Sequence, residues 1–317
     1  MHKKENLVVI VGPTAVGKTA LSLTLAQHFN GEIISGDSMQ VYRQMDIGTA
    51  KATEEERSLI PHYMIDIMEP DEEFSVAIFQ AKARQLISEI NHRGKLPFIV
   101  GGTGLYIQSV THSYQFSEAD QDPELRDRLQ LFADTEGVEA LHRRLREHDP
   151  ITADRLHPND VRRVIRAIEI YELTGKRMSD HQHQAAYSPY NLKIIGLTME
   201  RSKLYERVNH RVDLMIEAGL VEEVRQLLDL GYSPDLLAMQ GLGYKELIPY
   251  LYGEITLDKA ISDIKQRTRH FAKRQLTWFR RMPEISWYDL TEPESHEQVF
   301  QTITCEMEGM FPFSQNI

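Results

Sequence analysis

A phosphate-binding pattern lies near the start of the chain, between a strand-like segment and a helix-like one. Residues 12–19, GPTAVGKT, match G-x-x-x-x-G-K-[ST] and directly follow the apolar run LVVIV at 7–11. A continuous, largely β-branched run of this kind is typical of a strand that is buried on both faces. After the pattern, Leu21, Leu25 and Phe29 recur at helical spacing. This strand–loop–helix order is the context in which the pattern holds phosphate groups, so it predicts a phosphate-loop α/β fold.

Strand-like and helix-like segments continue to alternate after the loop. Such alternation predicts a parallel sheet flanked by helices. A helical stripe runs from Phe79 to Ile90, and Gly94 ends that helix. The later segments that are typical of strands are 32–35 (EIIS), 96–100 (LPFIV) and 191–199 (NLKIIGLTM).

The pattern changes in the middle of the chain, where no strand-like run occurs. Helical stripes dominate there, of which Val161, Val164, Ile165 and Ile168 form the clearest. We therefore predict an α/β fold with an inserted all-helical domain. The expected organisation is a core of residues 1–112 and 190–317, mostly helical after residue 199, interrupted by a helical insertion at 113–189.

Length and composition favour a soluble globular protein of about two domains at roughly 150 residues each. The 317 residues are 41% hydrophobic and 26% charged, and no apolar run approaches the length of a membrane span. One cysteine, Cys305, can form neither an internal disulfide nor a cysteine-rich zinc site. We expect a cytoplasmic monomer with no membrane partner. The net charge of −11 argues against a polyanionic partner only if the cations are spread evenly.

The loop itself predicts a diphosphate site. Its backbone N–H groups and the positive end of the following helix cradle a diphosphate, which belongs either to a nucleotide or to another diphosphate. We expect Lys18 to contact a phosphate oxygen and the Thr19 hydroxyl to suit Mg²⁺. The predicted diphosphate-binding residues are Gly12, Pro13, Thr14, Ala15, Val16, Gly17, Lys18 and Thr19.

Asp37 is the candidate base, because residues just after a parallel strand face the loop. A carboxylate there can take a proton from an attacking hydroxyl or amine, or position Mg²⁺ through water. The alternative is that Asp37 caps a turn, for which aspartate is favoured anyway. The segment 101–104, GGTG, has room for close backbone approach but carries no acid. Asp66 is the other candidate acid at a strand end, with a direct role left open.

Arg211 is an anomaly in the helical pattern that follows residue 199. It falls within the apolar stripe of Leu204, Val208 and Met215. A guanidinium on an apolar face needs an anionic partner, and the diphosphate is the natural one. The alternative is an arginine at the stripe edge that reaches a surface carboxylate.

The cations are concentrated near the end of the chain. Residues 265–283, KQRTRHFAKRQLTWFRRMP, contain seven lysines and arginines, no acids, and three aromatic residues. A basic helix with aromatic side chains fits a phosphate backbone and unstacked bases. The insertion adds Arg162, Arg163 and Arg166 on the face opposite its apolar stripe. Ordinary solvated helix faces are the alternative.

Six segments match the motifs of one known family. They are GPTAVGKT at 12–19, SGDSMQVYRQMDIGTAK at 35–51, GGTGLY at 101–106, HPNDVRRVIRAIE at 157–169, QGLGYKE at 240–246 and RQLTWFR at 274–280. On these segments the chain resembles the bacterial tRNA dimethylallyltransferases, also called tRNA isopentenyltransferases. The resemblance runs over nearly the whole chain, and DSMQVYRQMDIGTAK and HPNDVRR are close to diagnostic.

The resemblance implies transfer of the dimethylallyl group from dimethylallyl diphosphate to N6 of the adenine just 3′ of the anticodon. The tRNAs concerned read codons that begin with U, and the products are N6-dimethylallyladenosine and diphosphate. Asp37 is then the general base, while Lys18, Thr19, Arg211 and Mg²⁺ stabilise the leaving group. The adenine must leave the base stack, and the insertion is expected to act as a mobile clamp on the anticodon arm.

By resemblance, the contacts to tRNA come from all parts of the chain. The expected residues are Asp37, Ser38, Met39, Gln40, Thr103, Arg126, Arg162, Arg163, Arg166, Gln240, Gly241, Gly243, Tyr244, Lys245, Lys273, Arg274, Gln275, Thr277, Trp278 and Arg280.

Three other functions remain open at this point. A small-molecule kinase with the same loop and Asp37 would phosphorylate a hydroxyl and need ATP. A non-catalytic RNA-binding module on a phosphate-loop fold would not need Asp37 and Arg211. An enzyme that alkylates free adenine nucleotides would not need the extensive segments expected to contact tRNA.

Overall fold

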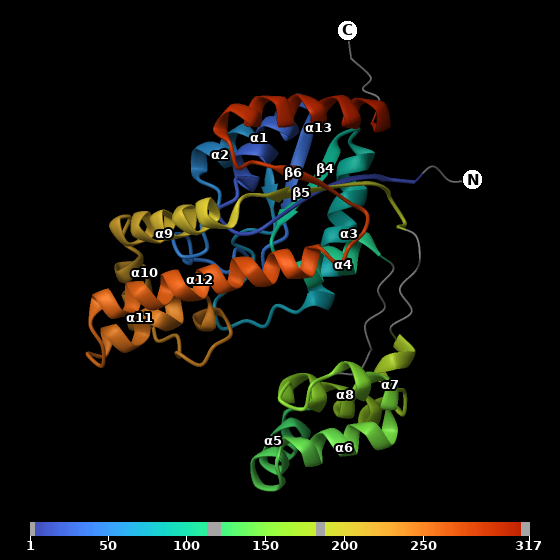
Figure 1. The fold of residues 1–317 in the computed structure, drawn as a ribbon, viewed down its shortest axis with the longest axis vertical. Helices are drawn as coiled ribbons and strands as arrows, with labels where there is room; N and C mark the ends of the chain where they lie inside the picture. The colour runs from blue at the N-terminus through green and yellow to red at the C-terminus, as the bar shows by residue number, and fades with distance from the viewer. Residues whose placement is uncertain (1–3, 113–121, 182–187, 312–317) are drawn as a thin grey trace. The chain divides into compact units, whose positions relative to one another are not determined.

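The computed structural model divides into two compact units, residues 1–111 with 188–317, and residues 112–187. We call the first the sheet unit and the second the helical unit. The structure describes residues 4–112, 122–181 and 188–311. In Figure 1 the sheet unit contains all the strands, whereas the helical unit contains α5 to α8.

Within its described residues, the sheet unit carries six strands and most of the helices. The strands are β1 (Asn6–Val11), β2 (Gly31–Ser35), β3 (His62–Tyr63), β4 (Leu96–Gly101), β5 (Asn191–Thr198) and β6 (Ile285–Asp289). The helices are α1 (Lys18–His28), α2 (Glu54–Leu59), α3 (Val76–His92), α4 (Gly104–Thr111), α9 (Arg201–Glu217), α10 (Leu220–Asp229), η2 (Ala238–Gln240), α11 (Tyr244–Leu251), α12 (Leu257–Phe279), η3 (Pro293–Ser295) and α13 (His296–Met310).

The six strands form one parallel sheet in the order β3-β2-β4-β1-β5-β6. Val9 of β1 pairs with Ile99 of β4 on one side and with Ile194 of β5 on the other. Because all strands run the same way, their carboxyl ends share one edge, where ligands bind in open sheets of this kind. The phosphate loop after β1 lies at that edge.

Both faces of the sheet are covered, which explains the continuous apolar run of β1. Leu7, Val9 and Val11 belong to one core cluster, whereas Val8 and Ile10 belong to the other, since neighbouring side chains point to opposite faces. Helices α3, α4, α10 and α11 contribute to the first cluster, and α1 and α13 to the second. The loop is therefore anchored to a strand with no exposed face.

The helical unit has its own core. It consists of α5 (Pro123–Glu136), α6 (Val138–His148), α7 (Pro150–Arg155), α8 (Val161–Thr174) and η1 (Met178–His181). Leu125, Leu129, Leu141 and Leu145 pack with the apolar stripe of α8. Four helices around a single apolar cluster make this unit compact without a sheet.

Two strands differ from the prediction. The strand implied just before Asp66 is β3, which has only two residues and ends at Tyr63, so Asp66 does not lie directly at a strand end. β6 (ISWYD) lies in the region expected to be mostly helical, and only its first residue, Ile285, is buried. A partly exposed edge strand lacks the continuous apolar run that identified β1. The chain after β5 is mostly helical, as predicted, and β6 is the strand that the prediction did not include.

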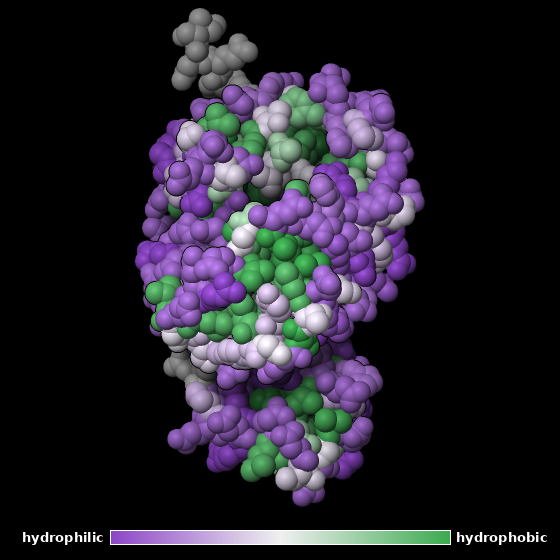
Figure 2. Space-filling model, turned by 90° about the vertical axis from the view of Figure 1, so that its left-hand side faces the viewer, coloured by the Kyte–Doolittle hydropathy of each residue, from purple (hydrophilic) through white to green (hydrophobic). Residues whose placement is uncertain are grey.

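Within the ranges that the structure describes, no helix is long and apolar enough to cross a membrane. Figure 2 shows the side of the molecule on which α9, α10 and α11 lie, where apolar side chains form patches among hydrophilic ones. Leu214, Leu230 and Leu237, from α9, the end of α10 and the α10–η2 connection, are among the exposed large apolar residues.

Candidate active site

The phosphate loop has the backbone conformation that an anion cradle requires. Gly12, Ala15 and Gly17 have positive φ values of 150°, 66° and 113°, and Gly17 caps the start of α1. A Cβ on Gly12 would lie 2.7 Å from the carbonyl oxygen of Leu197, so only glycine fits there. The first N–H groups of α1 and the positive end of its dipole are aimed at the loop.

Lys18, the first residue of α1, lies over the loop. Its Nζ donates to the carbonyl oxygens of Gly12 and Pro13 at 3.0 and 2.9 Å. Burial lowers the pKa of Lys18 to about 7, Arg211 acts in the same direction, and Asp37 opposes both. The Lys18 ammonium is bonded here to neutral carbonyl oxygens. An anion in the loop would therefore give it a charged partner and favour its protonated form.

Asp37 lies two residues beyond the end of β2, as predicted. Its Oδ1 accepts a hydrogen bond from the N–H of Met39 at 2.8 Å, so the turn-capping alternative describes a contact that Asp37 does make. Burial nevertheless raises the pKa of Asp37, although the Met39 N–H bond and the charges of Lys18 and Arg211 oppose that rise. A carboxylate with a raised pKa is a better proton acceptor than an ordinary one.

Arg211 comes from the middle of α9, where Leu204, Val208 and Val212 are buried. Among the described residues, no carboxylate lies within ion-pair distance of its guanidinium. The surface-pair alternative is therefore not supported by a contact in the structure. Burial lowers the pKa of Arg211, and Arg207 adds to that effect while Asp37 opposes it. The guanidinium remains charged because its reference pKa is so high.

Two cavities bring these groups together. The loop cavity, of about 110 Å³, is lined by Thr14, Ala15, Lys18, Thr19, Asp37 and Arg211 among others. The central cavity, of about 330 Å³, is lined by Asp37, Met39, Thr103, Arg211, Tyr244 and Arg274 among others. Thr14, Asp37 and Arg211 line both. The two cavities thus share a wall, and the candidate base lies in it.

Further residues of the 35–51 motif shape this wall. The side chain of Gln40 receives the Ser35 hydroxyl at 2.7 Å and donates to the carbonyl oxygens of Thr49 and Ala50 at 3.1 Å each. Ala50 has a positive φ of 49°, an unusual value for a residue with a side chain. The side chain of Gln40 was expected to contact tRNA. In the structure it bonds the backbone of Thr49 and Ala50, which line both cavities.

Next to that backbone, the buried Lys51 pairs with the half-buried Asp66. The Lys51 side chain is 2% exposed, and its Nζ donates to the carbonyl oxygen of Tyr42 and to Asp46, both at 2.6 Å, and also to Asp66. Asp66 also pairs with Arg57 at 2.8 Å. These bonds outweigh its partial burial and lower the pKa of Asp66. Both carboxylate oxygens of Asp66 are therefore paired with cations, and Asp66 lines neither the loop cavity nor the central cavity.

Tyr244 has a different environment from the predicted one. Its side chain is 1% exposed, its hydroxyl donates to Glu223 at 2.6 Å, and a Cβ on Gly48 would lie 2.5 Å from its ring. Glu223 also accepts the N–H groups of Asp46, Ile47 and Gly48 at 2.9, 2.7 and 3.1 Å. The Tyr244 hydroxyl is thus bonded to Glu223, and its buried side chain forms part of the wall of the central cavity.

The cations of α12 fall into two groups. Lys265 pairs with Asp213 at 2.6 Å, Arg267 lies 3.4 Å from Glu246, and Arg269 donates to Asn209 at 2.6 Å. Lys273 and Arg274 are exposed, and no ion pair of theirs occurs in the described ranges. The basic helix inferred from the sequence is therefore not equally available along its length, because Lys265, Arg267 and Arg269 have partners within the sheet unit.

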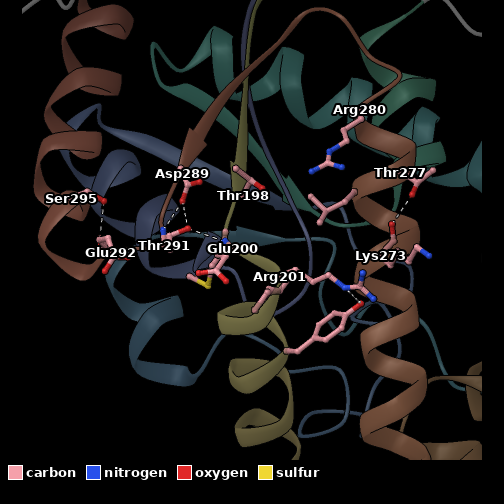
Figure 3. Close-up of a pocket in the computed structure, with 14 residues that line it drawn as sticks. Thr198, Glu200, Arg201, Lys273, Thr277, Arg280, Asp289, Thr291, Glu292 and Ser295 are labelled. Carbon is pink, nitrogen blue, oxygen red and sulfur yellow. Dashed lines mark hydrogen bonds between the residues drawn. The ribbon is translucent and has the colours of Figure 1, made fainter.

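The second half of α12 faces more than one cavity. Lys273, Thr277 and Arg280 line a third, outer cavity of about 930 Å³. Figure 3 shows Lys273 and Thr277 on α12 and Arg280 directly after it, opposite Arg201 at the start of α9 and Asp289 at the end of β6. Arg274 instead lines the central cavity. The predicted contacts at 273–280 therefore do not form one continuous surface.

The arginines expected to bind tRNA in the helical unit also differ from one another. Arg126 binds the fully buried Glu169 with two hydrogen bonds of 2.8 and 2.9 Å, and Arg166 binds it at 2.5 Å. Burial alone would raise the pKa of Glu169, but these bonds lower it. Arg126 and Arg166 thus share one buried carboxylate within the helical unit. Arg162 and Arg163 are exposed, and Arg163 pairs with Asp160 at 3.2 Å.

Other predicted residues lie around the central cavity. Thr103 accepts the N–H of Ser38 at 3.2 Å, which joins the segment after β4 to the segment after β2. Gln240, Gly241, Gly243 and Lys245 line the cavity beside Tyr244. Trp278 packs against Gly104, where a Cβ would lie 2.2 Å from its ring. Thr49, Ala50 and Phe271 line both inner cavities but were not among the predicted site residues, although Thr49 and Ala50 lie in the 35–51 motif and Phe271 in the basic stretch.

The chain is similar to known proteins over nearly all its length. A model of the family described as IPP transferase matches residues 40–282. A tRNA dimethylallyltransferase of Carboxydothermus hydrogenoformans is 55% identical over 304 residues, which cover 95% of this chain and 97% of that relative. One of Anoxybacillus flavithermus is 52% identical over 314 residues and covers 99% of each chain.

Solved structures agree with these relatives. A tRNA isopentenylpyrophosphate transferase of Bacillus halodurans is 50% identical with a TM-score of 0.74, covering 97% of both chains. A eukaryotic dimethylallyltransferase acting on tRNA is 32% identical with a TM-score of 0.84, covering 98% of this chain and 81% of its own. These likenesses confirm the predicted phosphate-loop α/β fold.

Proposed function

The chain belongs to the IPP transferase family, and we propose that it transfers a dimethylallyl group from dimethylallyl diphosphate to tRNA. The acceptor is N6 of the adenine just 3′ of the anticodon, in tRNAs that read codons beginning with U. The observation that carries the proposal is the wall shared by the loop and central cavities, because a reaction between two substrates needs one point at which they meet.

In this proposal the loop cavity holds the diphosphate and the central cavity holds the acceptor adenine. A bond forms between N6 and the first carbon of the dimethylallyl group while the carbon–oxygen bond to the diphosphate breaks. The leaving diphosphate takes the electron pair, and Lys18 and Arg211 stabilise its growing charge. Asp37 accepts the N6 proton, since it lies in the wall between the two cavities.

A divalent cation would have a specific place in this arrangement. Among residues 4–112, 122–181 and 188–311, no cluster of three His, Cys, Asp or Glu side chains could hold a metal ion. The ligands would therefore be the Thr19 hydroxyl, diphosphate oxygens and water, a set that suits Mg²⁺. When bound, Mg²⁺ would neutralise part of the diphosphate charge.

We propose that tRNA binds through the exposed cations of both units. Lys273, Arg274 and Arg280 supply them in the sheet unit, and Arg162 and Arg163 in the helical unit, residues 112–187. The acidic average of the chain does not oppose this, because phosphate contacts depend on local charge. We place the reaction in the cytoplasm, where tRNA is found; the monomeric state stays a prediction.

The salt dependence of tRNA binding tests which cations of α12 contact RNA. Replacing Lys273 and Arg274 by glutamine should flatten the plot of log affinity against log salt by about 1.4–1.8, at about 0.7–0.9 per lost phosphate contact. Filter binding between low and physiological salt measures the slope. The matched control, Lys265→Gln with Arg267→Gln, removes two cations of the same helix that face Asp213 and Glu246. An equal flattening in both double variants would contradict the assignment.

The direct test is incubation with labelled dimethylallyl diphosphate and unmodified tRNA, without ATP, followed by nucleoside analysis. We expect the label in N6-dimethylallyladenosine at the position just 3′ of the anticodon. A product that appears only with ATP would support the kinase alternative. Label on free adenine nucleotides would support the alternative of an enzyme that alkylates free nucleotides. Tight tRNA binding without any product would support a non-catalytic module. The names of the relatives support the transferase and none of these alternatives.

A further inference from the structure

Gln275 of α12 bridges two backbone segments of the active site. Its side chain is 5% exposed, its Oε1 accepts the N–H of Thr14 at 2.9 Å, and its Nε2 donates to the carbonyl oxygen of Gly102 at 3.1 Å. A primary amide has one accepting and one donating side, and only this orientation satisfies both backbone groups. The phosphate loop and the segment after β4 are therefore joined through one side chain of α12.

The contact leaves no room for movement of the helix against that segment. A Cβ on Gly102 would lie 2.0 Å from Nε2 of Gln275, and one on Gly104 would lie 2.2 Å from Cδ1 of Trp278. Glycine at both positions lets α12 lie directly on the backbone. A displacement of this part of α12 must therefore move the segment or break the bonds of Gln275.

The same turn of α12 carries exposed cations. Lys273 and Arg274 precede Gln275 directly and line the outer and central cavities. Thr14, at the other end of the bridge, lines the loop and central cavities. One turn of helix therefore presents charge to a polyanion on its exposed side and holds a phosphate-loop amide on its buried side.

We propose that Gln275 is a positioning residue that couples the two substrate sites. A tRNA bound to the exposed cations of α12 changes the affinity of the phosphate loop for diphosphate, and by linkage the diphosphate changes the affinity for tRNA by the same factor. This inference rests on the proposed function, because it takes tRNA and a diphosphate as the two ligands. It replaces the expectation that the Gln275 side chain contacts tRNA directly.

The test is titration calorimetry with inorganic diphosphate and Mg²⁺, with and without a saturating unmodified anticodon stem-loop RNA. In the unaltered protein we expect the RNA to change the diphosphate Kd by about fivefold or more, the lower range of allosteric coupling. In Gln275→Leu, which loses both bonds, the ratio between the diphosphate Kd values with and without RNA should fall below about twofold. The matched control is Gln80→Leu, since Gln80 is a buried glutamine of α3 that donates to the carbonyl oxygen of Ser109. It should keep the full ratio.

A second variant separates the bridge from simple loss of packing. Gln275→Glu keeps an acceptor for Thr14 but offers Gly102 no donor while it is ionised, so its ratio should be low at neutral pH. The ratio should rise as the pH is lowered and the carboxyl group gains a proton, a change that a merely structural role would not produce.

The inference is overturned if the RNA changes the diphosphate Kd by less than about twofold in the unaltered protein. It is also overturned if Gln275→Leu, folded by circular dichroism, keeps the full ratio; if that variant does not fold, Gln275→Glu decides. Failure of the proposed function is distinct, because the unaltered protein would then transfer no dimethylallyl group to tRNA. If the unaltered protein transfers the group and the Gln275 variants keep the full coupling, the role of Gln275 is refuted and the proposed function is not.

Discussion

We expect Asp37→Ala to lose dimethylallyl transfer by about 10³-fold or more while tRNA affinity stays within about tenfold. The exocyclic amine of adenine is a weak nucleophile because its lone pair is delocalised into the ring. A carboxylate that takes the N6 proton therefore acts mainly in the transition state, and its loss lowers the rate more than the binding. Single-turnover transfer rates and filter-binding affinities, measured on the same preparations, separate the two effects.

Asp37→Asn is the matched control for the local turn. An asparagine oxygen can still accept the N–H of Met39, which the Asp37 carboxylate accepts at 2.8 Å, but it cannot take a proton. We therefore expect the asparagine variant to be as inactive as the alanine one. If it transfers the dimethylallyl group at a near-normal rate, Asp37 acts only as a turn cap.

The dependence of kcat/KM on pH gives an independent measure of the same groups. Asp37 must be ionised to act as a base, so the rate falls as the pH drops through its raised pKa. Lys18 must be charged to bind the diphosphate, so kcat/KM also falls as the pH rises above its pKa of about 7. The profile should be bell-shaped, and the remaining activity of Asp37→Asn should lose the acid limb.

The sequence predicted the parts of the site that a strand or a motif fixes by itself. The run at 7–11 identifies a strand buried on both faces, and that strand carries the phosphate loop. The end of β2 places Asp37 at the same edge of the sheet, because all the strands are parallel. These predictions needed only the period of the side chains and the rule that parallel strands share their carboxyl edge.

Contacts between distant segments could not be predicted in the same way. Gln275 lies 261 residues from Thr14, and Glu223 lies more than 170 residues from the three N–H groups that it accepts. Nothing in a helix pattern distinguishes such residues from ordinary polar ones. In the basic stretch of α12 the sequence predicted too much. A charge count cannot tell that Lys265 and Arg267 face carboxylates of the same unit.

The second large effect is expected from Arg211→Ala, which should lower kcat/KM for dimethylallyl diphosphate by about 10²–10³-fold, as removal of one charge-stabilising donor does elsewhere. The guanidinium lines both inner cavities and, within the described part of the chain, has no carboxylate at ion-pair distance. A half-buried cation in this situation is costly without an anion. The bound diphosphate would supply this anion. Its negative charge grows on the leaving oxygen as the carbon–oxygen bond breaks, so the contribution of Arg211 should be largest in the transition state.

Two further variants refine the test of Arg211. One asks whether its geometry matters besides its charge, and the other controls for packing between α9 and α12. Arg211→Lys keeps the charge but loses the planar fork, so we expect it to recover part of the rate and not all of it. The control is Arg269→Ala, since Arg269 is also half-buried, lines none of the three cavities, and donates to Asn209 at 2.6 Å. Its transfer rate should stay within about threefold of the unaltered protein, because a neutral partner is left behind. Equal losses in Arg211→Ala and Arg269→Ala would mean that packing between α9 and α12, and not charge at the diphosphate, explains the effect.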